Sequence, residues 1–145
     1  MKISTKGRYA LRMLVDLAEF QDDGFISLNE ISLRQNISKK YLEQIVPMLN
    51  KAGLLRTNRG NKGGYRLNKS AETCTVGDVL RATEGSLAPV ACLEYDVNDC
   101  PKRNKCATLF VWEELYELTT RYFDSVTLRD IIDHQNSDNG GEYCI

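Results

Sequence analysis

Two short amphipathic helices, separated by three residues and followed by a glycine-rich hairpin, constrain the fold of this 145-residue chain more than any other feature. A capping box at residues 27–30 opens a helix to about residue 35, and Ser38 is the expected N-cap of a second helix over 39–51. Short β-runs on both sides of the glycine-rich loop 58–64 predict the hairpin. This order predicts a mainly α-helical fold with a small β-hairpin, arranged as a winged helix-turn-helix domain.

The rest of the chain adds helices and one irregular segment. Apolar residues recur at helical spacing near the N-terminus, before residue 85, over a longest stretch from 107 to about 123, and again after residue 127. The tail is rich in Asn, Asp, Gly and Ser, a composition typical of disorder. We therefore expect a DNA-binding domain, a cysteine loop, dimerisation helices and a disordered tail, at 1–84, 85–106, 107–134 and 135–145.

The two halves of the chain carry opposite charge. Residues 1–70 hold 13 Lys and Arg against 6 Asp and Glu, whereas residues 71–145 hold 6 against 14. Such asymmetry suggests that the basic half binds a polyanion, and together with the predicted fold it points to double-stranded DNA.

The start of the second helix of a helix-turn-helix faces base edges in the major groove. Glutamine can pair with adenine there, and a carboxylate can accept a hydrogen bond from cytosine, so Glu43 could discriminate between sites. A solvated helix face is the alternative for Glu43. The expected DNA contacts in this helix are Ser38, Lys39, Lys40, Tyr41, Glu43 and Gln44.

Cations outside that helix extend the predicted interface. Arg59 and Lys62 lie in the hairpin loop, where backbone N–H groups and side chains can reach phosphates or the minor groove. Lys2, Lys6 and Arg8 near the N-terminus add further expected phosphate contacts.

The long helix over 107–123 carries an aromatic and aliphatic stripe that exceeds what so small a domain can cover. The alternative is that the stripe packs only on its own domain. We expect a homodimer that reads a palindromic operator, since one such module reads only a few base pairs.

Three of the five cysteines, Cys92, Cys100 and Cys106, are spaced C-x7-C-x5-C. The chain has no signal-peptide pattern and no membrane-spanning run, so we expect a cytoplasmic protein in which clustered cysteines bind metal or do redox chemistry. Spacing alone leaves an iron–sulfur cluster, structural zinc and three free redox-active thiols open. Cys74 is expected to be buried, Cys144 to be an exposed thiol of the tail, and His134 to lie on the surface.

The segments MKISTKGRYA (1–10), ISKKYLEQ (37–44) and RGNKGGY (59–65) resemble the iron–sulfur cluster regulator (IscR) family of winged-helix repressors. The resemblance extends to about residue 133. It implies a homodimer whose long helices cross, with a [2Fe–2S] cluster held by Cys92, Cys100 and Cys106. Similar regulators of cysteine metabolism lack the cysteine trio.

Two features depart from that family pattern. The first cysteine gap has seven residues where better-known members have five, and Leu109 occupies a position that is often His. Near the place where some relatives take an acidic ligand, this chain has Lys6, Arg8 and Arg12. The fourth ligand is therefore open between an oxygen atom, Cys74, an exogenous thiol and water.

These features predict a dimeric transcriptional regulator, a repressor that senses iron–sulfur or redox status through its cysteine loop. A metal-free thiol repressor and an iron–sulfur electron carrier are the alternatives. An enzyme with a small-molecule substrate is not expected, because the chain has one poorly placed histidine and no nucleophile–base pair.

Overall fold

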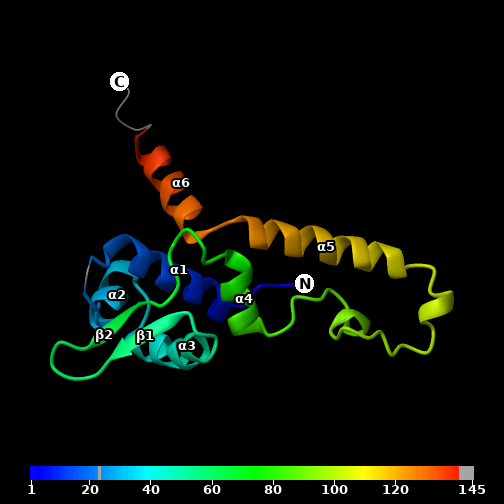
Figure 1. Cartoon of the computed structure of the whole chain (residues 1–145), viewed down its shortest axis with the longest axis horizontal. Coiled ribbons are helices and arrows are strands. Elements are labelled where there is room, and N and C mark those ends of the chain that lie inside the picture. Colours follow the sequence, from blue (N-terminus) through cyan, green and yellow to red (C-terminus); the bar gives the residue numbers. More distant parts are fainter. Residues whose placement is uncertain (23, 141–145) are drawn as a thin grey trace.

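The computed structural model describes residues 1–22 and 24–140. Within them the elements are α1 (Thr5–Phe20), α2 (Leu28–Gln35), α3 (Lys39–Lys51), β1 (Leu55–Asn58), β2 (Gly64–Leu67), α4 (Val76–Glu84), α5 (Leu109–Ser125) and α6 (Leu128–Gly140) (Figure 1). Two single 3-10 turns, Ala91–Leu93 and Arg103–Lys105, interrupt the cysteine loop. The predicted fold class, mainly α-helical with a small β-hairpin, is confirmed. Among the described helices, none is both long and apolar enough to cross a membrane.

Hydroxyl side chains define where the helices of the DNA-binding domain begin. The Ser27 hydroxyl accepts from the Glu30 N–H over 3.3 Å, and the Glu30 carboxylate accepts from the Ser27 N–H over 2.9 Å, so the predicted capping box is confirmed. Ser38 caps α3 by accepting from the Tyr41 N–H over 3.2 Å. Asn36 adopts a left-handed conformation with φ of 52°, which ends α2 and turns the chain into α3.

The hairpin is antiparallel, with Leu55 opposite Leu67 and Thr57 opposite Tyr65. Ile26, just before α2, adds an isolated bridge by exchanging two backbone hydrogen bonds with Tyr65 over 2.7 and 2.9 Å. A Cβ at position 64 would overlap the backbone of Ile26, so this close approach requires Gly64. The wing is thereby fixed to the body of the domain.

One hydrophobic core joins α1, α2, α3, the hairpin and the start of α6, with Leu14, Leu42 and Leu128 fully buried in it. Cys74 is also fully buried there, as predicted. A second, smaller cluster consists of Val76, Leu80 and Leu87, against which partly buried side chains of the N-terminus and of α5 pack, among them Ile3, Tyr116 and Phe123.

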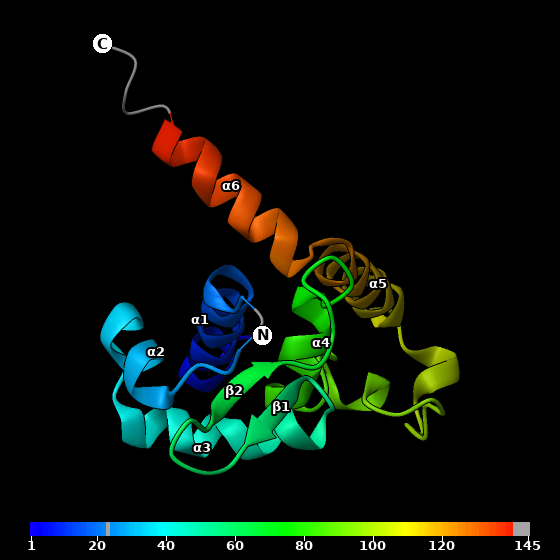
Figure 2. The same cartoon turned by 60° about the vertical axis from the view of Figure 1, so that its left-hand side comes forward.

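Helix α5 extends away from the winged domain, and α6 leaves its end in another direction (Figures 1 and 2). Of the α5 side chains, all of which the structure describes, none is buried. Tyr116 and Phe123 pack inward on the second cluster. On a different side of the helix, four exposed apolar residues at i, i+4, i+7 and i+11 form a continuous stripe: Val111, Leu115, Leu118 and Tyr122.

The C-terminal helix is longer than expected. Residues 135–140, which the sequence predicts to be disordered, continue α6 to Gly140, so that prediction is wrong for this segment. Burial of Leu128 and Ile132 anchors the first turns of α6, and extending an existing helix is far easier than starting one. Polar contacts support the extension, since the Ser137 hydroxyl donates to the Asp133 carbonyl over 2.9 Å. Residues 141–145, including Cys144, lie outside the described part of the chain.

Candidate DNA interface and cysteine loop

The predicted recognition residues occupy one side of α3. Leu42, Ile45 and Leu49 are buried on the inner side of this helix and hold it on the core. The outer side presents exposed side chains to solvent at Ser38, Lys39, Lys40, Glu43 and Gln44. Tyr41 is half-buried, and its ring packs edge-on against Tyr9 of α1 at 5.3 Å. Because the apolar residues of α3 face the core, the predicted DNA contacts of this helix face solvent, and only Tyr41 among them is half-buried.

The wing lies next to this exposed face. Its tip turns on Gly60, with φ of 115°, and on a hydrogen bond from the Gly63 N–H to the Gly60 carbonyl over 2.9 Å. Arg59 and Lys62 are exposed at the tip. A depression of about 450 Å³ separates α3 from the wing, and Lys39, Glu43 and Arg59 all line it. Two predicted recognition residues and one predicted wing cation thus share a single concave surface.

The N-terminal cations lie on a neighbouring element. Lys2 and Arg8 are exposed and Lys6 is half-buried. Arg8 Nη2 donates to the hydroxyl of Thr5 over 2.9 Å, which holds its guanidinium along the first turn of α1. The contact between Tyr9 and Tyr41 brings this end of α1 against the start of α3. The basic first turn of α1 therefore adjoins the recognition helix.

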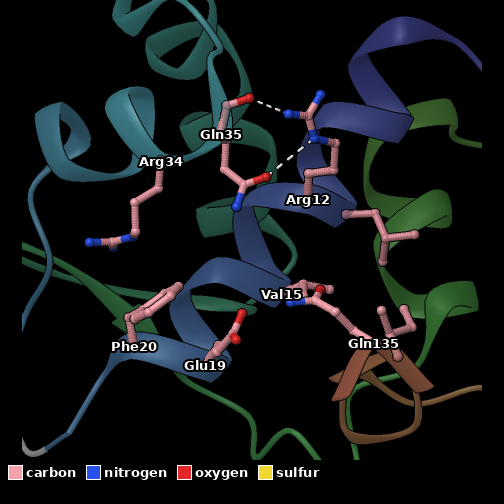
Figure 3. Close-up of a pocket in the computed structure, with 9 residues that line it drawn as sticks. Arg12, Val15, Glu19, Phe20, Arg34, Gln35 and Gln135 are labelled. Carbon is pink, nitrogen blue, oxygen red and sulfur yellow. Dashed lines mark hydrogen bonds between the residues drawn. The ribbon is translucent and has the colours of Figure 1, made fainter. Parts of the chain in front are cut away.

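A polar network fixes the helix-turn-helix geometry on α1. Asp16 is fully buried and accepts hydrogen bonds from Arg34 over 2.8 and 2.9 Å and from Gln35 over 3.0 Å. Arg12 donates through Nε to the Gln35 side chain over 3.3 Å and also donates to the Gln35 backbone carbonyl (Figure 3). These bonds tie the end of α2 to the middle of α1, directly before the turn into α3.

Sequence reasoning missed this network. The available signal is Asp16 itself, a carboxylate on the apolar face of α1 beside Leu14, Val15 and Leu17. A buried carboxylate requires a paired donor. The sequence does not say that this donor comes from α2.

The three loop cysteines lie on the segment between α4 and α5, which leaves the end of α4, runs along α5 and turns back into its start (Figure 1). Cys92 is in the first 3-10 turn and half-buried, Cys100 is half-buried, and Cys106 is exposed directly after the second turn. Within the described residues, no group of three or more Cys, His, Asp or Glu side chains is placed so that it could hold a metal ion. The structure therefore puts the trio on one loop without gathering all three thiols into one metal-binding group.

The chain's cysteines differ sharply in chemistry. Hydrogen bonds from the side chain and backbone of Thr108 lower the pKa of Cys106, and the charge of Lys102 adds to the effect. Burial raises the pKa of Cys74 to about 11. Exposure and a lowered pKa favour the thiolate that reacts and binds metals, so Cys106 is better suited to such chemistry than Cys74. Cys74 is enclosed in the core and is not available to the loop as a fourth ligand.

Comparison with known proteins decides the family. The model of the Rrf2 family, described as an iron-dependent transcriptional regulator, matches residues 3–134. The chain belongs to the Rrf2 family. It is 39% identical over 132 residues to protein rrf2 of Nitratidesulfovibrio vulgaris, covering 91% of this chain and 87% of that protein. It is 36% identical over 136 residues to the transcriptional regulator IscR of Yersinia pestis, covering 94% of this chain and 82% of that one.

The Rrf2 fold is also found in a solved structure. The global cysteine regulator CymR of Bacillus subtilis superposes with a TM-score of 0.74 and 35% identity, covering 92% of this chain and 98% of that one. The predicted resemblance to IscR-like winged-helix regulators is confirmed, and the chain is a transcriptional regulator of the DNA-binding Rrf2 type. Relatives named IscR and CymR match equally well, so similarity alone does not assign what this Rrf2 protein senses.

Proposed function

We propose that this Rrf2 protein is a cytoplasmic homodimeric repressor that reads a palindromic operator and senses iron–sulfur or redox status through Cys92, Cys100 and Cys106. The observation that carries the DNA-binding part is the depression between α3 and the wing, which Lys39, Glu43 and Arg59 line together. A recognition helix in the major groove and a basic wing tip beside it is the docking geometry of this class of domain.

The support for a homodimer is the exposed stripe of α5, formed by Val111, Leu115, Leu118 and Tyr122. Leu118 is 56% and Tyr122 65% exposed in one protomer, which is unusual for large apolar side chains in a contiguous row. The spacing alternates between four and three residues, as in the seam of two packed helices. A second copy of α5 is the occupant that this stripe fits, and pairing would place two recognition helices about a two-fold axis.

The loop fits an iron–sulfur cluster in its donor chemistry. Cys92, Cys100 and Cys106 would hold the cluster as thiolates, and Lys102, Arg103 and Lys105 would offset its negative charge. Whether the loop holds a cluster would then depend on the iron supply and on oxidation of the cluster. Because the three thiols are not gathered into one metal-binding group in the described loop, holding a cluster requires the loop to close on it. Leu109 at the start of α5 cannot ligate, so the fourth ligand comes from outside this set.

A metal-free thiol repressor is the second candidate, and two observations favour it. The three thiols do not form one metal-binding group, and Cys106 is exposed with a pKa that Thr108 lowers. A peroxide can oxidise such a thiol to a sulfenic acid and is itself reduced to water or an alcohol. A second cysteine thiol can then displace water from the sulfenic acid to form a disulfide.

Anaerobic purification separates the two candidates. The proposal predicts a coloured protein with a visible absorption band, iron and acid-labile sulfide, and loss of all three in Cys92→Ala. Binding to a palindromic DNA at fixed salt should then differ between cluster-loaded and apo protein. A colourless, iron-free anaerobic sample that binds DNA differently before and after thiol oxidation would support the thiol repressor instead. Equal DNA binding in every state would contradict sensing by this loop.

A further inference from the structure

The N-cap of α1 and the last residue of α4 are joined by a contact that spans 80 positions of sequence. Oε1 of Glu84 accepts from the Ser4 backbone N–H over 3.0 Å and from the Ser4 hydroxyl over 2.6 Å. The same hydroxyl accepts from the Gly7 N–H over 3.1 Å and so caps α1. Glu84 thereby orients the hydroxyl that starts the helix.

The site is shaped around this contact. A Cβ on Gly7 would overlap Oε1 of Glu84 and crowd Leu80, so a side chain at position 7 would displace this carboxylate. The first turn of α1 carries Lys6, and Lys2 and Arg8 flank it. Tyr9 holds the same end of α1 against Tyr41 at the start of the recognition helix.

The charge of Glu84 has opposite effects on the two helices that it joins. A carboxylate at the last residue of α4 faces the negative end of that helix dipole, which is unfavourable within α4 itself. The same carboxylate lies at the N-terminus of α1, where the dipole is positive and the backbone N–H groups need acceptors. Its position therefore stabilises α1 at some cost to α4.

Glu84 also stands where the cysteine loop begins. Gly85 follows it with φ of 78° and ends α4, and two residues later Leu87 is buried in the second cluster, against which Ile3 packs. In Figure 1 the N-terminal segment passes beside α4, near the place where the chain leaves for the loop. The base of the loop and the first turn of α1 are thus held by the same contacts, those of Glu84 and of the second cluster.

We infer that Glu84 is a positioning residue for DNA binding: acting through Ser4, it holds the basic first turn of α1 against the phosphate backbone and links that turn to the base of the cysteine loop. The inference rests on the proposed DNA interface. A shift of the loop at Gly85 would reach Lys2 and Lys6 through this carboxylate.

The sign of one substitution tests the inference. Removing a negative charge from a DNA-binding protein should by itself strengthen binding. Loss of positioning should weaken it. We expect Glu84→Ala to weaken operator binding roughly fivefold to tenfold and to reduce the slope of log K against log salt by about 1 to 2, as the contacts of Lys2 and Lys6 are lost. Glu84→Gln keeps an acceptor for Ser4 and should bind at least as well as the wild type.

Matched variants complete the experiment. Asp133→Asn removes an exposed carboxylate of α6 and reports the effect of charge alone. Ser4→Ala removes the hydroxyl half of the contact together with the N-cap of α1, although Glu84 can still accept from the backbone N–H at position 4. It should weaken binding in the same direction and serves in place of Glu84→Ala should that variant fail to fold. In a Lys2→Ala, Lys6→Ala background, Glu84→Ala should cost no further affinity. Hydrogen exchange without DNA should show faster exchange of the amides of residues 7 and 8 in Glu84→Ala.

The outcomes distinguish failure of the proposed DNA binding from failure of the role of Glu84. Wild-type protein without specific DNA affinity would overturn the proposed function. Specific wild-type binding that Glu84→Ala leaves unchanged or strengthens would overturn only the role of Glu84. Equal weakening by Glu84→Ala with and without Lys2 and Lys6, or unchanged amide exchange in the first turn of α1, would also overturn it.

Discussion

The buried carboxylate of Asp16 and the guanidinium of Arg34 are joined by two hydrogen bonds of 2.8 and 2.9 Å, although the Arg34 side chain keeps 30% of its surface in solvent. The pair is therefore asymmetric, because only one of its members has lost all contact with water. This asymmetry decides which half of the pair is more costly to remove.

Arg34→Ala leaves a fully buried carboxylate without its main donor, so we expect it to lower the free energy of unfolding by about 3 to 5 kcal/mol. Asp16→Ala should cost less, because Arg34 can turn toward water. Urea unfolding followed by circular dichroism measures both. Arg129→Ala, which breaks an exposed pair with Glu72, is the control and should change little. Equal losses from the two core variants would contradict the asymmetry.

Substitution of Gln44 and of Arg59 should affect DNA binding in different ways. Gln44→Ala should lose about 1 to 3 kcal/mol of discrimination at one base pair, because a side-chain contact to a base edge is sequence-specific. Arg59→Ala should weaken binding to all sequences and reduce the salt slope by about 1. Fluorescence anisotropy over a salt series checks both. Lys51→Ala, at the other end of α3, should leave the slope unchanged.

A charge in the exposed stripe of α5 should prevent pairing. Leu118→Glu is expected to convert the proposed homodimer to a monomer, since a buried unpaired carboxylate opposes burial of the stripe. Light scattering after gel filtration gives the mass. Arg121→Glu, at an exposed position of α5 outside the stripe, also adds negative charge and should remain dimeric. A dimeric Leu118→Glu would show that another surface pairs the chains.

Iodoacetamide should distinguish Cys106 from Cys74. At pH 7.5, Cys106 should be alkylated first, because it is exposed and its pKa is lowered by Thr108. Cys74 should react only on unfolding, since it is buried and its pKa is raised to about 11. Mass spectrometry of timed samples identifies each site. In urea the two cysteines should react alike, and early labelling of Cys74 in native protein would contradict its burial.

The raised pKa of Cys74 also predicts a loss of stability in alkali. Above about pH 9 the unfolded chain releases the thiol proton, whereas the folded chain holds it until about pH 11. The unfolded state binds fewer protons in this window, so the free energy of unfolding falls by up to about 1.4 kcal/mol per pH unit. Below pH 8 the thiol contributes no such dependence. Cys74→Ala should show a shallower decline between pH 9 and 11 in parallel unfolding curves.

The fold was predictable because its signals are local. The capping box at Ser27, the N-cap at Ser38 and the helical period of α3 each lie within a few residues of what they determine. The partners of Asp16 and of Glu84 lie 18 to 80 residues away, and no periodic pattern reports them. The length of α6 was missed because composition describes the isolated segment and not the buried Leu128 and Ile132 that start it.

In the candidate site, too, the sequence predicts the local features but not those that depend on tertiary packing. Spacing and residue type were enough to select Lys39, Glu43 and Arg59, since each belongs to a short element with a known exposed side. Their convergence on one depression depends on how the wing packs against α3. For Cys92, Cys100 and Cys106 the sequence supplies three sulfur donors, but convergence of those donors is a property of the loop's conformation. The spacing C-x7-C-x5-C does not determine that conformation.

The exposed stripe of α5 has a genetic consequence. A copy damaged only in α3 or the wing keeps an intact α5, and we expect it to pair with undamaged copies. Each mixed pair would bring one working recognition helix to a two-fold operator, and its affinity would fall steeply. In a cell that makes both versions, a mutation that damages α3 or the wing should therefore be dominant over the intact allele. A mutation that damages α5 should be recessive, because such copies do not pair with intact copies.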